Sequence, residues 1–562
     1  MKFKYIVYSA LLTVVALGTS SCEDFLSKNP DNRVELPGAD QMRMALVNAY
    51  TYGNYATMCE LSGDNFVDNN APNESGMRYN LGEYSRLHNE IFAWEPGVSD
   101  NQQDSPSSVW EGCYHAIAVA NHVLERVAEF EAEGRGEEVA SVKGEALVCR
   151  AYHHFLLVNL FCQPYRGPEL SKSLQGIPYA TSPETELSVV YDRGNLADTY
   201  DKIEADLLAG LPLISDVDYE QPKYHFNMSA ANAFAARFYL YKRDYEKAEQ
   251  YASVALGTEG AIDPSQLNDY WAQSFTGAEQ AVQYWVSVER QSNYLILATQ
   301  SVFWRLVGYR YAINGDGADA TIQSYGPSWT QSDLVVDGAQ YLCHPCYMNG
   351  LYSWGGQEYG VWFPSMLELF EYTDRIAGIG YPHIVRVEFS AEETLFTRAE
   401  ARIYLGKIDE AIADLKAWDD ARQNNTSTIV LPELTKERIL AFYRDSDPGH
   451  GIVKELNIDK VYPSDKYSVT PEIEPYLQCA LHFRRIHLVG DGTRWFDIKR
   501  YGLELSHAIG ATRVETLLWD DPRRAFQLPA DVLSAGMEPT DRNTKISNPE
   551  DYRMPVSALV KK

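Results

Sequence analysis

The sequence predicts a mainly α-helical protein, in which tetratricopeptide-like helical hairpins form a scaffold that carries a loop-rich aromatic insertion. The first observation is a repeat: residues 229–256 and residues 391–418 each read as two short helices with a tight turn between them. The second is that helical periodicity fades between residues 257 and 389, where aromatic residues crowd instead. Such a hairpin cannot bury its own apolar face, so both copies must stack on further helices.

The two copies of the hairpin match in step. Small residues stand where helices would cross, and a turn separates the helices, as in the tetratricopeptide pattern. Because this pattern is degenerate, two unrelated alanine-rich hairpins are the alternative interpretation. The matched positions are Ala236, Arg243, Tyr245, Ala248 and Ala252 in the first copy and Ala399, Gly406, Ile408, Ala411 and Leu415 in the second.

Composition narrows the function classes. The chain has 562 residues, 45% of them hydrophobic, and a formal charge of −29. That charge repels nucleic acid and argues against a nucleic-acid-binding protein. Aromatic residues reach 12% and suit the binding of amphipathic ligands such as sugars or peptides.

The first residues resemble a bacterial lipoprotein signal. Lys2 and Lys4 precede an apolar run, and small residues lead to Cys22. We expect a signal peptide over residues 1–21, lipidation at Cys22, a polar tether over residues 22–39 and one domain over residues 40–562. An ordinary secretory signal followed by a chance cysteine is the alternative.

Helices are expected over residues 40–52, 110–131, 142–161 and 196–211 from their apolar spacing. Residues 64–106 form a long loop, which in a globular chain is either disordered or functional. Its aromatic residues argue against disorder. His153 and His154 are adjacent and make no i, i+4 pair, so we interpret them as packing residues and expect no metal there.

The insertion over residues 257–389 holds six of the eleven tryptophans: Trp271, Trp285, Trp304, Trp329, Trp354 and Trp362. Cys343 and Cys346 have CxxC spacing without a second pair. A local disulfide or plain loop thiols are therefore favoured over a metal site. We expect no cofactor.

The most specific motif spans residues 476–504. A helix runs to Leu488 and stops at Gly490-Asp491-Gly492. Thr493 is placed to cap a further helix and Gly502 to end it. Within that helix the expected inward residues are Trp495, Phe496 and Ile498, and those expected to face out or bridge to carboxylates are Arg494, Lys499 and Arg500.

These residues resemble the SusD/RagB family of outer-membrane nutrient-binding lipoproteins. The run from Asp491 to Arg500, DGTRWFDIKR, is similar to the late signature of the family, and Phe483 and His487 stand where the family usually has Glu. That departure weakens an expected helix charge network. Further matches are Cys22-Glu23-Asp24-Phe25-Leu26, Trp110 with Tyr114, Ile117 and Asn121, and Glu145-Ala146 with Arg150-Ala151-Tyr152.

The resemblance implies a SusD-like helical scaffold with a loop-rich ligand face. It implies a palmitate-bearing, lipid-anchored protein at the cell surface that captures oligosaccharides, delivers them to a TonB-dependent outer-membrane transporter and is not an enzyme. The alternatives are a RagB-like oligopeptide-binding protein, a surface glycoside hydrolase using two carboxylates, and a structural assembly protein. The sequence contains no zincin, G-x-S-x-G or P-loop motif.

We expect the ligand site on a face made by residues 64–106 and 257–389, because rigid scaffolds carry binding on such loops. A platform needs an aromatic face beside amide or guanidinium donors. For any one residue, a buried loop anchor is the alternative. The candidate contacts are Arg78, Trp94, Asn101, Tyr325, Trp329, Tyr352 and Trp354.

Overall fold

The computed structural model describes most of the chain from residue 36 to residue 543. For the strands between residues 334 and 361 it describes the backbone. Cys22, Cys343 and Cys346 lie outside the described residues, as does the predicted signal peptide. The residues not described within that range are 73–75, 77, 185–190, 268–277, 315–320, 322–324, 330–333, 337–338, 342–350, 355–356, 362–364, 366, 423–431 and 464.

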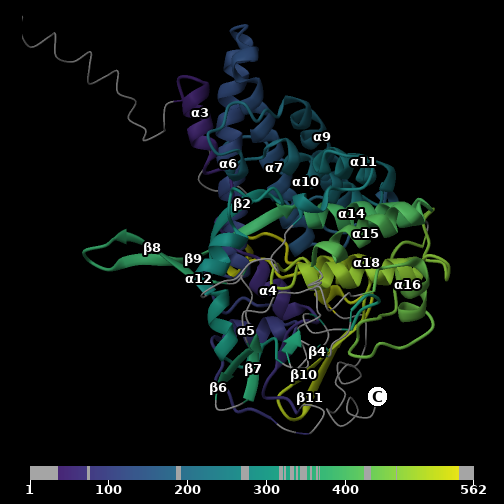
Figure 1. The fold of residues 1–562 in the computed structure, drawn as a ribbon. Helices are drawn as coiled ribbons and strands as arrows, with labels where there is room; N and C mark the ends of the chain where they lie inside the picture. The colour runs from purple at the N-terminus through teal and green to yellow at the C-terminus, as the bar shows by residue number, and fades with distance from the viewer. Residues whose placement is uncertain are drawn as a thin grey trace, which may run out of the picture.

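Packed helices form the scaffold, in the order expected from their apolar spacing. Helix α6 (Pro106–Ala132) packs on α7 (Ala140–Phe161), and α7 packs on α9 (Leu196–Gly210). The two predicted hairpins are α10 (Met228–Lys242) with α11 (Tyr245–Leu256), and α14 (Ala391–Tyr404) with α15 (Ile408–Arg422). Helix α11 lies against α14, so the hairpins stack side by side (Figure 1). The mainly α fold and the stacked repeat are confirmed.

The two hairpins turn in the same way. Arg243 and Gly406 occupy matched positions, and both adopt left-handed backbone, with φ of 62° and 76°. Glycine takes that conformation freely, whereas a residue with a side chain is strained there. Arg243 is held by an ion pair with Asp465 and by the ring of Tyr462, 4.2 Å from its guanidinium. In the first copy, contacts of the Arg243 side chain therefore stabilise the left-handed backbone that glycine adopts freely in the second copy.

The insertion contains more regular structure than the loop-rich prediction. Strands β2 (Asn293–Gln300), β8 (Leu369–Asp374) and β9 (Ile379–Ser390) form an antiparallel sheet in the order β2-β9-β8. Fading helical periodicity predicts a loop here, but β2 is an apolar run rich in strand-forming residues whose partner lies about 90 residues later in the chain. Helix α12 (Ala278–Trp285) also lies in this region.

The late motif forms α18 (Glu474–His487) and α19 (Arg494–Tyr501), and Gly502 ends α19 in left-handed backbone as expected. The expected cap was wrong, because Thr493 makes no side-chain hydrogen bond at the helix start. The preceding turn is held instead by buried Glu60, whose Oε1 accepts from the N–H groups of Gly490 and Gly492 at 3.1 and 3.0 Å.

Every side chain of α19 is buried, so none of its basic residues faces outward. Arg494 pairs with Asp64 through two contacts of 2.9 Å. Arg500 bonds to Glu400 of α14 at 2.8 Å. The prediction was wrong for Lys499, whose Nζ donates to the carbonyl of Cys162 at 2.7 Å instead of bridging to a carboxylate.

Helix α18 has Phe483 and His487 where the family usually has Glu, and Glu400 of α14 supplies a carboxylate to this region instead. Its carboxylate accepts from Arg484 of α18 at 2.8 Å as well as from Arg500. Although burial opposes ionisation, these two guanidinium groups hold the pKa of Glu400 at about 2. Phe483, where the family usually has Glu, instead packs against Trp418, with ring centroids 4.8 Å apart.

His153 and His154 are fully buried packing residues of α7, as expected. Cys59, Cys113, Cys149, Cys162 and Cys479 are buried free thiols. Within the described part of the chain, no helix is long and apolar enough to span a membrane and no cluster of side chains fits a metal ion. Other elements are α3 (Ala39–Leu46), α4 (Ala56–Ser62), α5 (Arg86–Phe92), α8 (Pro168–Ser171), α16 (Lys436–Tyr443), α17 (Ile458–Val461), α20 (Ala530–Ser534), β1 (Val67–Asp68), β3 (Tyr311–Ala312), β4 (Leu334–Val336), β5 (Ala339–Tyr341), β6 (Leu351–Trp354), β7 (Gln357–Val361), β10 (Leu505–Ile509) and β11 (Arg513–Leu517).

Candidate ligand-binding face

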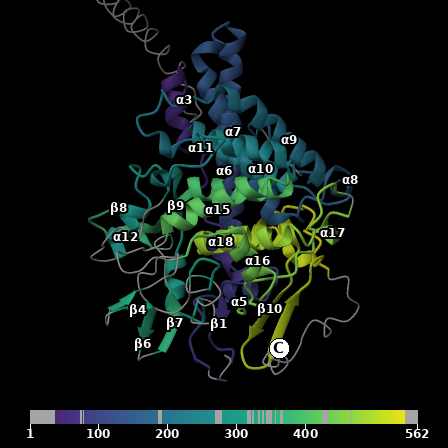
Figure 2. The ribbon, with the colours of Figure 1, turned by 45° about the vertical axis from the view of Figure 1, so that its right-hand side comes forward.

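Residues 64–106 and the insertion meet in one surface. Strand β1 of the first stretch pairs antiparallel with β3 of the second, with Val67 opposite Ala312 and Asp68 opposite Tyr311. Arg310 fixes this junction through two bonds to the Asp68 carboxylate, 2.9 and 2.6 Å long. The junction lies at the end of the molecule where Figure 2 labels α5 and β1, away from the helical scaffold.

Two tyrosines and an arginine stand at this junction. Tyr84 precedes α5, and Tyr309 follows a 3-10 turn, Phe303–Gly308; their ring centroids lie 5.2 Å apart in an edge-on arrangement. Tyr309 is 37% exposed. Arg305 in that turn lies with its Nη1 3.3 Å from the Tyr84 hydroxyl. Tyr84 is half-buried and stacks on His88, with ring centroids 5.6 Å apart. The exposed ring of Tyr309 beside a guanidinium supplies the elements of a stacking site with a hydrogen-bond donor.

Glu368 orients Arg305. Two hydrogen bonds of 2.7 and 2.6 Å join the guanidinium to that carboxylate, and they raise the pKa of Arg305. The planar cation is therefore held in one orientation before any ligand arrives. Such preorganisation reduces the entropy lost on binding.

Asparagine side chains stiffen the loops beneath these groups. Asn70 accepts from the N–H of Leu81 at 2.8 Å and donates to its carbonyl at 2.9 Å. Asn314 of the insertion donates to Asn69 of the first stretch at 3.1 Å. These amides bind the loops to each other, so the junction is a firm support for the exposed Tyr309.

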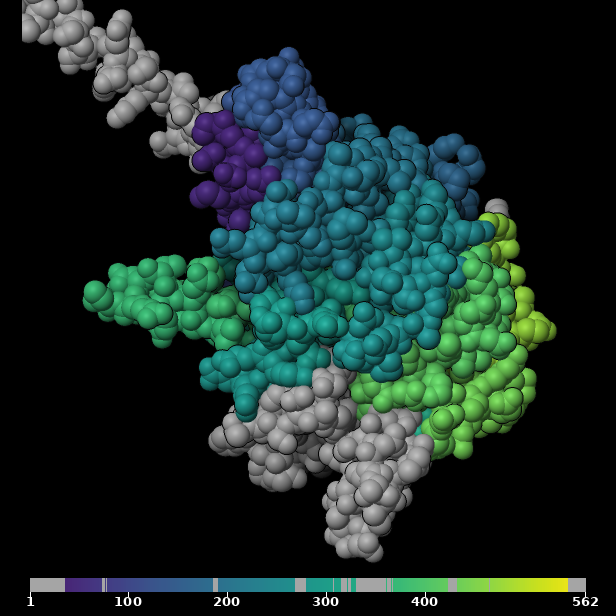
Figure 3. Space-filling view, turned by 45° about the horizontal axis from the view of Figure 1, so that its top comes forward, coloured from purple at the N-terminus to yellow at the C-terminus, as the bar shows by residue number. Residues whose placement is uncertain are grey.

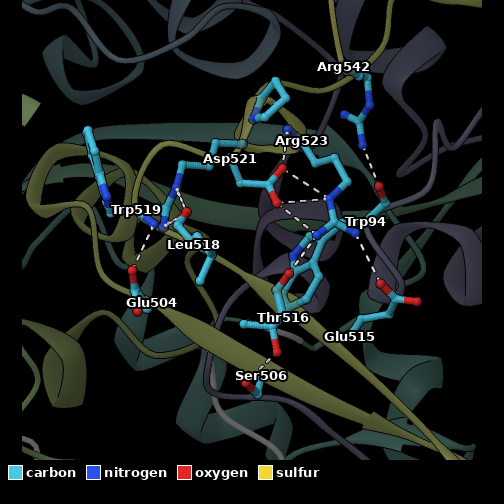
Figure 4. Close-up of polar contacts among 12 residues, drawn as sticks. Trp94, Glu504, Ser506, Glu515, Thr516, Leu518, Trp519, Asp521, Arg523 and Arg542 are labelled. Atoms are coloured by element: carbon cyan, nitrogen blue, oxygen red, sulfur yellow. Dashed lines mark hydrogen bonds and ion pairs between the residues drawn. The ribbon is translucent and has the colours of Figure 1, made fainter. Parts of the chain in front are cut away.

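Trp94 lies inside the protein. It is 3% exposed, its ring stacks on His507 with centroids 4.1 Å apart, and its indole N–H donates to the carbonyl of Ser62 at 3.0 Å. Arg523 lies 5.8 Å above the ring, and Arg542 donates to the Trp94 carbonyl at 2.6 Å (Figure 4). The indole has no free face, so the structure gives it the alternative role, that of a buried loop anchor.

Trp329 is buried in the same way, at 3% exposure. Its ring lies 5.2 Å from that of Phe483 and 6.0 Å from that of His482, both on α18. This contact anchors the insertion to the scaffold. The apolar Phe483 at a position where Glu is usual thus supplies a surface on which an indole can pack.

Three of the other predicted contacts lie at the surface. Arg78, Asn101 and Tyr325 are exposed. Asn101 lines a groove of about 440 Å³ with Asp100, with Glu111 of α6 and with Asp531 of α20. Tyr352 and Trp354 lie in β6, whose side chains are outside the described residues. Ligand contact by these residues stays a prediction.

Sequence reasoning missed Tyr309 and Arg305. A signal was present, since Tyr309-Arg310-Tyr311 places two rings and a cation together in the insertion. The prediction favoured tryptophan over tyrosine as the ring that contacts the ligand, and so passed over this signal. Large rings are usually the most buried, whereas tyrosine can present its ring at the surface and keep its hydroxyl hydrated.

Carboxyl groups with a pKa near neutrality, a property of general acids, do occur in the described part. Burial raises the pKa of Glu60 to about 7 and that of Asp104 to about 6, but both accept internal hydrogen bonds: Asp104 accepts from Ser301 at 2.7 Å. Desolvation raises the pKa of Asp491 to about 8, and this residue lines a cavity of about 20 Å³. That volume holds a water molecule and no sugar ring.

Comparisons with known proteins agree on one group. A family model described as starch-binding and associating with the outer membrane matches residues 24–240. The chain is 23% identical over 437 residues to SusD-like protein P2 of Formosa agariphila, covering 75% of this chain and 77% of that protein.

Solved structures share the fold. A SusD superfamily protein from Bacteroides vulgatus superposes with a TM-score of 0.56 at 19% identity, covering 90% of this chain and all, 100%, of the other. One from Bacteroides thetaiotaomicron gives 0.55 at 17% identity, covering 90% and 100%. A laminarin-binding SusD-like protein gives 0.50 at 16% identity, covering 90% and 99%.

Proposed function

We propose that this chain, which is similar to SusD-like proteins in sequence and fold, is a member of the SusD/RagB family: a cell-surface lipoprotein that captures oligosaccharides and delivers them to a TonB-dependent outer-membrane transporter. The family model is described as starch-binding, and one structural neighbour binds laminarin. Both descriptions support a glycan over a peptide as the ligand. Anchoring through Cys22 and the transporter partner follow from the family resemblance.

The observation that carries the ligand assignment is the Tyr84–Tyr309–Arg305 group at the junction of the two loop regions. A sugar ring presents C–H groups on one face and hydroxyls around its edge. The C–H face would lie on Tyr309, and Arg305, held by Glu368, would donate to the hydroxyls. Arg78, Asn101 and Tyr325 remain proposed ligand contacts.

We propose binding without turnover. The raised-pKa carboxyls Glu60, Asp104 and Asp491 serve internal contacts or a water-sized cavity. A glycosidase needs two carboxylates on either side of a bound sugar. Release of reducing ends from a bound glycan, lost on substitution of a single Asp or Glu, would contradict this part of the proposal.

The test is a binding screen with the secreted form that lacks residues 1–22. Laminarin, maltooligosaccharides and a library of oligopeptides are titrated against it by calorimetry. Saturable binding of at least one glycan is expected, without release of reducing ends. Binding of peptides alone would replace the proposal by a RagB-like peptide-binding function.

A further inference from the structure

A two-stranded arm projects from the body of the protein. We use this name for residues 369–382, which comprise β8, the first residues of β9 and the turn between them; Figures 1 and 3 show it standing off to the left. Strand β2 ends at Gln300 opposite His383, and His383 also pairs with Leu369 of β8. Beyond His383 the arm is therefore a ribbon of two strands without a third.

Large apolar side chains are exposed along the arm. Phe370 is 43% exposed, Tyr372 53%, Ile379 60% and Ile376, in the turn, 101%. Elsewhere in the described part such side chains are exposed singly or in pairs, as is normal for a soluble surface. Four of them lie within ten residues of chain, and such a concentration of exposed apolar side chains is characteristic of an interaction site.

One face of the ribbon is continuous and apolar. The rings of Phe370 and Tyr372 lie 4.9 Å apart on β8, opposite Pro382 and Gly380 of β9. A Cβ atom added to Gly380 would lie 2.0 Å from the carbonyl oxygen of Glu371 and 2.7 Å from the Phe370 ring. The glycine therefore allows both the β8 backbone and the Phe370 ring to lie close to the neighbouring strand.

The outer edge of β8 is open. It is the last strand in the order β2-β9-β8, so its outward N–H and C=O groups have no strand partner in the described structure. Proteins usually protect such an edge against pairing with other chains. A two-stranded ribbon is also only marginally stable on its own. Pro382 interrupts the outer edge of β9, but no proline interrupts β8 before its irregularity at residues 372–374.

We propose that the arm is a docking element for a partner protein, the outer-membrane transporter of the proposed function, on which this inference rests. An extended segment of the transporter adds to the open edge of β8 by main-chain hydrogen bonds. Its apolar side chains cover Phe370 and Tyr372. Strand addition with side chains seated beside it is an established mode of protein recognition, and aromatic residues are enriched at protein interfaces.

Other occupants fit the arm less well. Two copies of the chain, each with a charge of −29, repel one another. Glu371 and Asp374 stand among the apolar residues, and carboxylates are unfavourable within a bilayer. The rings of Phe370 and Tyr372 are inclined at 68°, which does not make a flat platform for a sugar.

The experiment uses tagged full-length protein purified from solubilised outer membranes of its native host, with the co-purifying β-barrel protein quantified. One variant combines Phe370→Ser with Tyr372→Ser. A second replaces residues 371–381 by an Asn-Gly turn. The matched control combines Val217→Ser with Val254→Ser, which are 91% and 52% exposed outside the arm. Melting temperatures of all variants should equal that of the wild type, because none of these side chains is buried.

We expect both arm variants to recover at least about tenfold less transporter than the control, as for loss of interface hot spots. If the wild type recovers no β-barrel, the transporter partner of the proposed function fails; if wild type and arm variants recover it equally, the role of the arm alone fails.

Three further results would also overturn the inference. They are a wild-type dimer that dissociates when the arm is shortened, loss of phosphatidylcholine vesicle binding by the shortened non-lipidated protein, and loss of retention on immobilised laminarin with full recovery of the transporter.

Discussion

Tyr245 and Tyr404 stack face to face, with ring centroids 4.3 Å apart and ring planes 7° from parallel. Tyr245 begins α11 in the first hairpin and Tyr404 ends α14 in the second, so the pair lies in the seam between the two repeats. Arg243 lies 5.4 Å from one ring and 5.3 Å from the other. The strained turn of the first hairpin thus contributes a cation to the seam.

Tyr404→Ala should lower the free energy of unfolding by roughly 3–5 kcal/mol, because it empties half of the stack in the core. Urea unfolding measures it. Val254→Ala, on the exposed face of α11, serves as the control and should change little. A wild-type unfolding midpoint for Tyr404→Ala would mean that the seam does not hold the repeats together.

Tyr245→Phe should leave stability unchanged or raise it. The Tyr245 hydroxyl is buried and makes no hydrogen bond to any described residue. Removing an unsatisfied buried hydroxyl relieves a desolvation penalty of about 1–3 kcal/mol. A clear loss of stability in urea unfolding would show that the hydroxyl has a partner.

Gly406→Ala should destabilise the protein by about 1–2 kcal/mol, because φ is 76° at this position. Gly308→Ala is the matched control. A Cβ would meet nothing within 4 Å at either position, and Gly308 does not have left-handed backbone. Equal effects of the two substitutions on the melting temperature would contradict the conformational explanation.

Tyr309→Ala should weaken binding of the glycan found in the screen by roughly 1–3 kcal/mol, by analogy with stacked bases. Tyr224→Ala, at a tyrosine that is 49% exposed elsewhere on the molecule, should bind like the wild type. Trp94→Ala should instead lose about 3–5 kcal/mol of stability. A stable Trp94→Ala protein that no longer binds would restore the sequence-based prediction that Trp94 contacts the ligand.

Stability should fall in mild acid because of buried histidines. Burial lowers the pKa of His153 to about 4; its Nε2 accepts from the N–H of Thr51 at 3.0 Å. An unfolded histidine has a pKa of about 6.5. Between these values the unfolded chain binds more protons, so the free energy of unfolding falls as the pH is lowered from about 6.5 to about 4, by up to roughly 3 kcal/mol.

Urea titrations at pH 7 and pH 5 measure this effect. His153→Gln should show a smaller difference between the two pH values than the wild type. His122→Gln, at an exposed position of α6, provides the control and should keep the wild-type difference. An unchanged pH dependence in His153→Gln would assign the effect to other groups.

The repeat could be predicted from sequence because its signals are local. Small residues at crossings and the turn at Arg243 and Gly406 lie within one hairpin each. The family resemblance rested on a local motif too, and it is confirmed by the family match and the shared fold. For the junction of the two loop regions, the sequence predicts that residues 64–106 and 257–389 share a face but not which residues join them.

Long-range partners explain what sequence reasoning missed. The partner of β2 is β9, and the burial of Trp94 depends on His507, more than 400 residues away. Thr493 has the chemistry of a helix cap, yet Glu60 holds that turn from a different helix. Nothing in the spacing around these residues reveals such contacts.

The strand that forms the arm continues without a loop into the scaffold. Strand β9 ends at Ser390 and α14 begins at Ala391, with the Ser390 hydroxyl accepting from the N–H of Glu393 at 3.2 Å. A force applied to the ribbon would therefore be transmitted to the stacked hairpins through continuous hydrogen-bonded backbone, because no loop separates β9 from α14. The arm is thus coupled mechanically to the stacked hairpins.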